Sequence, residues 1–350
     1  MPNKRLLTGL SLLLTGILLM TLLLSAPALA EGVTEIVPTH ETVQLEKGFS
    51  VVRLDGEDWL EDFLAQGGAE SDTGVVTFLG KKLLFGQHDL QLDLPGFGCS
   101  SLSVSAPDGD ALFGRNFDWY SCETLIVENH PATGYASVST VNLDFLSVAK
   151  ALPDSALNLA ALYAGLDGMN ECGLCAAVLY IQGIKAIDQQ SSRPDLTTTT
   201  LIRLLLNKAA NVDEALALLE QYDFHASFGM SVHFALSDAD GRSVAVEYIN
   251  GEMLVTETPA LTNFVIADCA EHGTGTAQSV TRYEILTQQL ADTPVMDENG
   301  VQAAMQSVDK SHWYDGEATE WTMVCNKTEK TVTYYHRQDY THGWTIRLGE

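Results

Sequence analysis

The 350-residue sequence predicts an α+β fold, on the evidence of its turns and of its apolar spacing. Two pairs of strand-like runs flank strong turns, at Pro107-Asp108-Gly109 and at Asp238-Ala239-Asp240-Gly241, and each pair indicates an antiparallel hairpin. Residues 196–206 and 215–221 instead carry apolar side chains at helical spacing, and the second run follows an Asn211 cap. Because such helices bury their apolar side on a sheet, the pattern indicates a layered α+β protein.

The first 30 residues are typical of a secretory signal peptide. Lys4 and Arg5 precede a charge-free, mostly apolar run at 6–24, and Ala28-Leu29-Ala30 provides a small-residue cleavage site before Glu31. The apolar run, of about 19 residues, is also long enough for an uncleaved membrane anchor, which stays the alternative. We therefore expect a secreted or otherwise extracytoplasmic protein.

Residues 31–98 form a second unit of mixed character. Residues 51–54 and 75–79 are strand-like, and residues 58–65 have helical spacing. The unit ends at Gly98, directly before a cysteine, and a glycine allows the backbone a strained conformation there. Two interpretations stay open: a pro-segment that is removed, or the first layer of the fold, followed by a domain at 99–350.

Composition limits the possible partners. The formal charge of −27 argues against nucleic acid and anionic membrane surfaces, and we expect a small-molecule substrate, with an oligomer possible. If one of the six cysteines is catalytic, five remain, and an odd number does not indicate a disulfide framework. Cys172 and Cys175 form a C-x-x-C without a second pair at zinc-site spacing, so we interpret them as core thiols.

The hairpin at 98–119 carries the candidate chemistry. With its centre near Asp108 and Gly109, Cys99 on one strand faces Asp118 on the other, with Arg115 close by. Arg115 and Asp118 are three residues apart, so a regular strand directs them to opposite faces, and only a bulge would bring both to one side.

A thiol needs a base before it becomes a good nucleophile, and no histidine is near Cys99 in sequence. One solution uses the nucleophile's own α-amine, whose ordinary pKa is about 7.7–8.0. This requires cleavage after Gly98, and Asp118 would then hold the new amine. The alternative is a buried structural cysteine at the start of a strand.

The motifs Cys99-Ser100-Ser101 and Gly114-Arg115-Asn116-Phe117-Asp118-Trp119 resemble the choloylglycine hydrolase and penicillin V acylase family of N-terminal-nucleophile amidases, to which acid ceramidase and N-acylethanolamine acid amidase are related. The resemblance runs from Cys99 to nearly the end of the chain. It implies a four-layer αββα sandwich of two antiparallel sheets. It also implies hydrolysis of a linear N-acyl amide through an acyl-enzyme, with no metal or organic cofactor.

The same resemblance assigns further site residues. Asn170-Glu171-Cys172-Gly173-Leu174 matches a family turn before the strand that bears Tyr180, whose backbone N–H would help bind the oxyanion. Asn263, after Thr262, would supply the second oxyanion donor, and Arg282 in Ser279-Val280-Thr281-Arg282-Tyr283 would support the nucleophile. Taken alone, these three residues would be interpreted as a strand aromatic, a turn asparagine and a solvated helix arginine.

Other functions remain as alternatives. The separation between Asn263 and Arg282 is shorter than in bile-salt hydrolases, so bile-salt specificity is not implied. The long segment before Cys99 is more similar to the ceramidase and acyltransferase branches, and an acyltransferase would use the same acyl-enzyme. A non-catalytic binding protein would tolerate an uncut Cys99, whereas a papain-like protease would need a Cys-Trp signature that is absent around Cys99.

Overall fold

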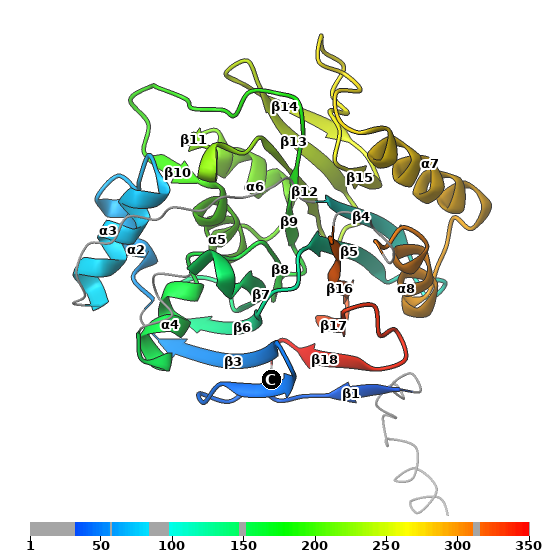
Figure 1. The fold of residues 1–350 in the computed structure, drawn as a ribbon, viewed down its shortest axis with the longest axis horizontal. Coiled ribbons are helices and arrows are strands. Elements are labelled where there is room, and N and C mark those ends of the chain that lie inside the picture. The colour runs from blue at the N-terminus through cyan, green and yellow to red at the C-terminus, as the bar shows by residue number, and fades with distance from the viewer. Residues whose placement is uncertain (1–31, 57, 84–97, 147–151, 311–315, 350) are drawn as a thin grey trace, which may run out of the picture.

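Two stacked β-sheets with helices on both outer sides form the protein (Figure 1). The computed structural model describes residues 32–56, 58–83, 98–146, 152–310 and 316–349, so the predicted signal peptide at 1–30 lies outside the described residues. The main apolar core lies between the two sheets and includes side chains from both. The predicted α+β sandwich is therefore confirmed.

The first sheet has seven strands and contains the predicted hairpin at 98–119. One of its inner strands, β5, is buried along its whole length, because one face meets the other sheet and the other meets helices. In order across the sheet, the strands are β1 (Val33–Glu35), β18 (Gly343–Arg347), β17 (Thr331–His336), β16 (Ala318–Asn326), β5 (Ala111–Trp119), β4 (Gly98–Ser105) and β15 (Ala260–Thr262).

The second sheet has nine strands and contains the other predicted hairpin, with Val232–Ser237 paired to Ser243–Ile249. Its order is β14 (Glu252–Glu257), β13 (Ser243–Ile249), β12 (Val232–Ser237), β9 (Cys175–Tyr180), β8 (Asp167–Asn170), β7 (Ser137–Asn142), β6 (Thr124–Pro131), β3 (Phe49–Gly56) and β2 (Val43–Glu46).

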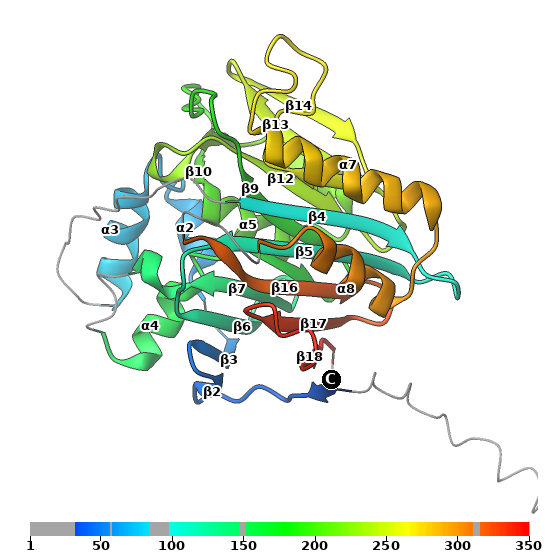
Figure 2. The same cartoon turned by 45° about the vertical axis from the view of Figure 1, so that its right-hand side comes forward.

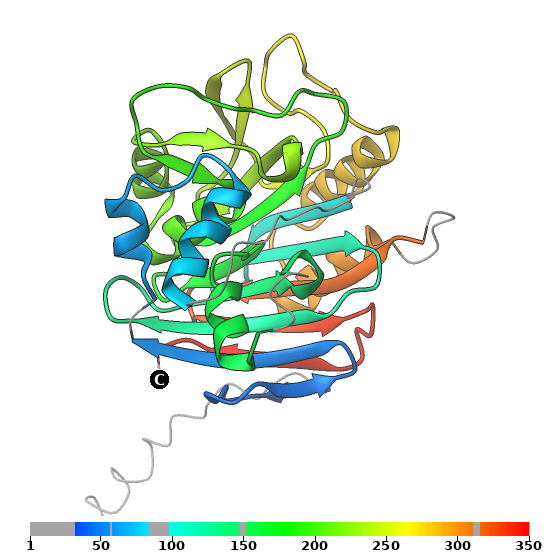
Figure 3. The same cartoon turned by 60° about the vertical axis from the view of Figure 1, so that its left-hand side comes forward.

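Helices cover each sheet from outside. Figure 2 shows α7 (Ala277–Asp292) and α8 (Glu298–Ser307) across the seven-stranded sheet, where they contact β4, β5, β15 and β16. Figure 3 shows the opposite side, where α4 (Asp154–Ala161) and α5 (Thr198–Lys208) contact the nine-stranded sheet. The remaining helices are α2 (Leu60–Ala65), α3 (Asp72–Leu83) and α6 (Val212–Leu219), with 3-10 turns at Leu143–Leu146 and Ser227–Gly229.

A small parallel pair, β10 (Asp195–Thr197) and β11 (Asp223–His225), lies apart from the main sheets. Here His225 lies between two carboxylates, with Nδ1 2.6 Å from Asp188 and Nε2 2.9 Å from Asp195. Burial lowers the pKa of His225, but the hydrogen bonds to the two carboxylates outweigh it, so the pKa is raised from its ordinary 6.5. The two hydrogen bonds of the imidazole therefore join this pair to the preceding loop.

The segment before Cys99 contributes to both sheets. β1 pairs in parallel with β18 of one sheet, and β3 pairs in parallel with β6 of the other. The prediction of purely antiparallel sheets is therefore wrong at these two pairings. Parallel pairing arises because each strand enters from a distant part of the chain, with a long connection before its partner.

One local prediction is also wrong, and one glycine has an unexpected place. Residues 75–79 belong to α3 and not to a strand, because Val75, Phe78 and Leu79 have helical spacing and bury one helix face. An Asp-Gly pair such as Asp167-Gly168 is typical of a turn, yet both residues lie in β8, where a Cβ on Gly168 would come within 2.3 Å of the Val138 carbonyl oxygen. Close packing between strands explains this glycine.

None of the helices in the described part of the chain has both the length and the apolar character needed to cross a bilayer. The anchor considered for residues 6–24 lies outside the described residues.

Candidate active site

Cys99 is the second residue of β4 and is fully buried, with its side chain in the core between the sheets. The hairpin register differs from the prediction by one residue, since Cys99 faces Phe117 and Gly98 faces Asp118. The reason is the loop at 106–110, which is closed by hydrogen bonds from Ala106 N–H to the Asp110 carbonyl and from Gly109 N–H to the Ala106 carbonyl. Its centre is Asp108 alone.

Arg115 lies on the same face of the sheet as the Cys99 side chain. Its Nε is 2.8 Å from Asp167 Oδ2, and its Nη2 donates to the Val178 carbonyl over 3.0 Å. The guanidinium also lies over the rings of Phe117 and Trp321, at 5.1 and 5.7 Å from their centroids. A buried carboxylate, a carbonyl and two aromatic faces therefore hold the cation in the inter-sheet core.

Asp118 points to the other face of β5, toward the helices. Pairing of β4 with β5 is regular from Gly98 to Ser105, so no bulge brings Asp118 and Arg115 to one side. Asp118 Oδ2 accepts a hydrogen bond from Arg282 Nη1 over 2.7 Å, and its Oδ1 accepts one from the Thr319 hydroxyl over 2.7 Å. The irregularity lies instead in β16, between Thr319 and Trp321, opposite Asp118 and Phe117.

Arg282 connects Asp118 to Asn263. Its Nη2 donates to Asn263 Oδ1 over 2.7 Å, and the same oxygen accepts the backbone N–H of Cys99 over 2.6 Å. The other end of the amide, Asn263 Nδ2, donates to the Tyr180 carbonyl over 2.7 Å. Donors and acceptors thus fix the orientation of the Asn263 amide, with its oxygen toward the Cys99 nitrogen.

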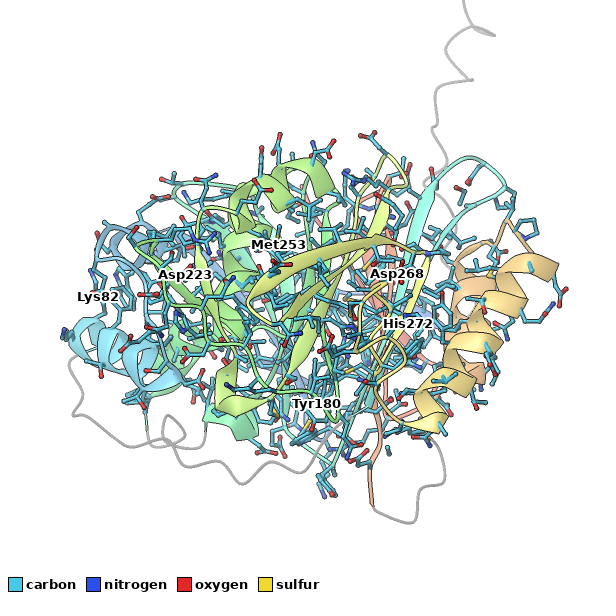
Figure 4. The ribbon with its side chains drawn as sticks, turned by 90° about the horizontal axis from the view of Figure 1, so that it is seen from above. Lys82, Tyr180, Asp223, Met253, Asp268 and His272 are labelled. Carbon is cyan, nitrogen blue, oxygen red and sulfur yellow. The ribbon has the colours of Figure 1, made fainter. Side chains whose placement is uncertain are left out.

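The supports of this network come from several elements. Asn263 directly follows β15, and the Thr262 hydroxyl donates to the Ser279 carbonyl in the first turn of α7, one turn before Arg282. Beyond Asn263, the backbone N–H groups of Ile266 and Ala267 donate to Glu247, itself paired with His233 at 3.0 Å. Figure 4 shows this part of the molecule from above, with Tyr180 labelled and α7 on the right.

Burial dominates the electrostatics of the thiol. Burial raises the pKa of the Cys99 thiol and is the largest effect. The Asp118 carboxylate also raises this pKa, whereas the charges of Arg115 and Arg282 and a hydrogen bond from the Asp118 backbone lower it. The net direction is upward from the ordinary value, so the thiol is protonated near neutral pH in the uncut chain. Any nucleophilic role therefore needs a base beside it.

The predicted residues are thus found together in space, although their assigned roles are separate proposals. Cys99, Asp118, Asn263, Arg282 and the Tyr180 carbonyl form one continuous chain of hydrogen bonds. Arg115 lies on the inter-sheet face, the same face as the Cys99 side chain. In the described part of the chain, no group of three or more His, Cys, Asp or Glu side chains is arranged to hold a metal ion.

Sequence reasoning missed four residues beside this network. Asp167 and Thr319 hold Arg115 and Asp118, and Lys310 pairs with Glu317 next to Gly98. Each comes from a segment far from Cys99 in sequence. A local motif therefore gave no signal for them.

The chain is similar to known proteins in sequence and in fold. The model of the linear amide C–N hydrolases, choloylglycine hydrolase family, matches residues 99–312, so the match begins at Cys99. Over 99 residues the chain is 30% identical to penicillin V acylase of Pectobacterium atrosepticum. This stretch covers 25% of the chain and 26% of that protein, about a quarter of the relative's length.

Two solved structures are similar in fold. A mutant of the conjugated bile acid hydrolase of Clostridium perfringens aligns with a TM-score of 0.54 and 16% identity, over 71% of this chain and 92% of that chain. Penicillin V acylase of Agrobacterium tumefaciens aligns with a TM-score of 0.50 and 18% identity, over 71% of this chain and 86% of that chain. At such identities the likeness shows the fold alone.

Proposed function

Because the chain belongs to the choloylglycine hydrolase family of linear amide C–N hydrolases, we propose that it hydrolyses a linear N-acyl amide with Cys99 as nucleophile. One observation carries the proposal. The hydrogen-bond chain from Asp118 through Arg282 and Asn263 ends on the backbone nitrogen of Cys99 and not on its sulfur. A network aimed at this nitrogen is what an α-amine base requires, whereas a structural cysteine needs none.

The active chain, we propose, begins at Cys99. The Cys99 thiol attacks the Gly98 carbonyl, the peptide C–N bond breaks, and an S–C bond forms as the nitrogen takes the thiol proton. Water then hydrolyses the resulting thioester, releasing the Gly98 carboxylate and regenerating the thiol. The freed α-amine stays next to Asn263 Oδ1, the position that the peptide nitrogen already has.

Turnover then follows the chemistry of an acyl-enzyme. The α-amine takes the thiol proton as sulfur attacks the substrate carbonyl, and it gives that proton to the leaving amine as the C–N bond breaks. Water next attacks the thioester, with the amine again as base, and the acid product leaves. Arg115 stabilises the thiolate from the inter-sheet core, and Asp118 and Arg282 orient the amine.

The proposed oxyanion donors are the Tyr180 backbone N–H and Asn263 Nδ2. In the uncut chain Asn263 Nδ2 donates to the Tyr180 carbonyl over 2.7 Å, which brings this amide next to the residue whose N–H would be the other donor. The amide NH2 group carries two hydrogens, and the one that does not bond this carbonyl would donate to the oxyanion. The buried bond on Oδ1 keeps the amide in place while it does so.

Residues 31–98 are proposed to remain attached after the cut. Three side chains of β3, Phe49, Val51 and Val52, are fully or almost fully buried in the core, each worth roughly 1.5–3 kcal/mol. Glu46 also binds His336 and Trp344 of the C-terminal strands, over 3.0 and 2.8 Å. Loss of this segment would therefore open both sheets. With removal of a signal peptide at 1–30, the mature protein would be an exported two-chain enzyme.

The proposal is tested by mass and by turnover. Purified protein is analysed by intact mass spectrometry and assayed with penicillin V, conjugated bile acids, N-acyl amino acids and N-acyl ethanolamines. We expect a chain that starts at Cys99 and hydrolysis of at least one of these amides. Cys99→Ala should stay uncut and inactive, and Cys99→Ser should be cut slowly. Full activity in a chain whose N-terminus lies upstream of Cys99 would refute the mechanism.

The same assay separates hydrolysis from acyl transfer. Both reactions pass through one acyl-enzyme, so a competing amine is added and the products are identified. Carboxylic acid as the main product supports a hydrolase, and a new amide as the main product supports an acyltransferase. An uncut protein that binds the amide without releasing its acyl group would instead indicate a binding protein.

A further inference from the structure

Lys310 is a buried lysine beside the candidate site, and none of the sequence motifs assigns it a role. It lies between α8 and β16, and only 5% of its surface is exposed. Its Nζ is 2.5 Å from Glu317 Oε2. Its backbone N–H donates to the Thr319 hydroxyl over 2.9 Å, and the same hydroxyl donates to Asp118. Lys310 is therefore connected to the Asp118 end of the network.

The lysine side chain also closes the space around Gly98. A Cβ on this residue would be 2.5 Å from Lys310 Cε, 2.6 Å from its Nζ and 2.8 Å from Asp118 Oδ2, all shorter than real Cβ contacts. The φ angle of Gly98 is not in the left-handed region, so the strained conformation that a glycine allows at this position is not adopted. Glycine is required here because an ammonium and a carboxylate pack directly against it.

We propose that Lys310 is a positioning residue for the proton transfer, and that after cleavage its ammonium keeps the freed α-amine of Cys99 unprotonated. The inference rests on the proposed function, because the amine exists only if the chain is cut after Gly98. Before the cut, the ammonium packs against the residue that precedes Cys99. After the cut, Gly98 is separated from Cys99 while its segment stays attached through β1 and β3, and the ammonium faces the new amine across the space that Gly98 occupied.

The charges on the helix side of β4 have competing effects on that amine. Asp118 favours its protonated form, but Arg282 is bonded to this carboxylate and offsets its charge. The Lys310 atoms are among the three nearest to the Gly98 Cβ position, so its positive charge is closer than the negative charge of Glu317. A like charge at such a distance disfavours the ammonium form of the amine.

The other neighbours leave this balance unchanged. On the inter-sheet face, the Arg115 charge is offset by the buried Asp167 carboxylate at 2.8 Å. Beside β4, Asn263 is neutral, and the group that Tyr180 presents to it is a backbone carbonyl. An α-amine with an ordinary pKa of about 7.7–8.0 would be mostly protonated at neutral pH, so a nearby cation makes it a better base there.

The test is a pH profile of the processed enzyme. The double variant Lys310→Met/Glu317→Gln removes the pair without leaving one buried charge unpaired. We expect the acidic limb of the kcat/KM profile to move to higher pH by about one unit. At a fixed pH on that limb kcat/KM therefore falls roughly tenfold, and its plateau at alkaline pH stays unchanged. Lys310→Arg keeps the charge and should keep the limb. Lys327→Met, at a buried lysine bonded to Ser237, is the matched control and should not move it.

A second readout does not depend on the substrate. The rate at which iodoacetamide alkylates Cys99 is measured against pH, because the thiol gives its proton to the same amine. The profile of the double variant should shift in the same direction as its kcat/KM. If the wild type is cut but hydrolyses no amide, the proposed function fails, and this alkylation profile alone decides the role of Lys310.

Two results would overturn the inference. One is a double variant whose activity falls equally at every pH, which would make Lys310 a packing residue only. The other comes from the single variant Glu317→Gln, which retains the cation and removes its partner. The acidic limb of kcat/KM of this variant should move to lower pH. A limb that stays in place or moves to higher pH contradicts the inference, and this result can be obtained even if the double variant does not fold.

Discussion

Replacement of Asn263 by alanine provides the most direct test of the hydrogen-bond network. Its oxygen accepts hydrogen bonds from the Cys99 N–H and from Arg282 over 2.6 and 2.7 Å, and its nitrogen is the proposed oxyanion donor. Loss of one such donor costs about 2.7–4 kcal/mol in the transition state, so kcat should fall by about 10²–10³. Single-turnover kinetics on a cleaved amide would measure this loss directly.

The same substitution should also reduce stability. Arg282 Nη2 and the Cys99 nitrogen lose a buried acceptor, and each unsatisfied group costs roughly 1–3 kcal/mol. We therefore expect the free energy of unfolding to fall by about 2–6 kcal/mol, less if water enters the space. Urea unfolding of the processed protein measures this change.

Two further variants separate catalysis from stability. Asn263→Asp keeps the accepting oxygen but replaces the donor, so it should lose kcat by about 10²–10³ and retain more stability than the alanine variant. Asn116→Ala removes another buried asparagine of the same sheet, which bonds Met305 and Thr322 but not Cys99. It should lose stability and retain kcat. Equal kcat losses in Asn116→Ala and Asn263→Ala, or an active Asn263→Asp, would refute the donor role.

The remaining predictions concern the whole chain. After the cut, the fragment 31–98 should co-elute in gel filtration without denaturant with the fragment that begins at Cys99. An active enzyme that has lost the fragment 31–98 would contradict this prediction. In the native host, the upstream fragment should begin near Glu31, whereas an intact Met1 in cytoplasmic protein would exclude export. His225→Asn should destabilise the protein most below pH 6.5, because the raised pKa adds stability that is lost as pH rises through the folded value. A destabilisation independent of pH would contradict the charged clamp between Asp188 and Asp195.

The sequence was most informative where signals are local. The hairpin at 98–119, the β12–β13 hairpin and the helices α5 and α6 follow from turn residues and apolar spacing, and all of them are present. The register was wrong by one residue because a turn of the Pro-Asp-Gly type can close as a two- or a five-residue loop. Hydrogen bonds across Ala106 and Asp110 select the longer loop, and side-chain pattern alone does not reveal them.

Long-range contacts were the part that the sequence could not predict. Val75, Val76 and Thr77 favour a strand by their β-branched side chains, but α3 forms because Phe78 packs on Phe63 and Tyr163 of distant segments. Asp167 has the local signature of a turn, yet it is the buried partner of Arg115. In both cases the tertiary environment overrides a local preference of at most about 1 kcal/mol.

The spacing of Arg115 and Asp118 gives a physical reason for the shape of the site. A cysteine that supplies both nucleophile and base has two reactive atoms, the sulfur and the nitrogen, and they need different neighbours. The sulfur lies on the inter-sheet face with Arg115, and the nitrogen is reached from the helix side through Asn263, Arg282 and Asp118. Residues three apart on a regular strand point to opposite faces. A bulge that brought Arg115 and Asp118 to one side would move either the cation away from the thiol or the carboxylate away from the amine. The proposed chemistry therefore requires the regular pairing of β4 and β5.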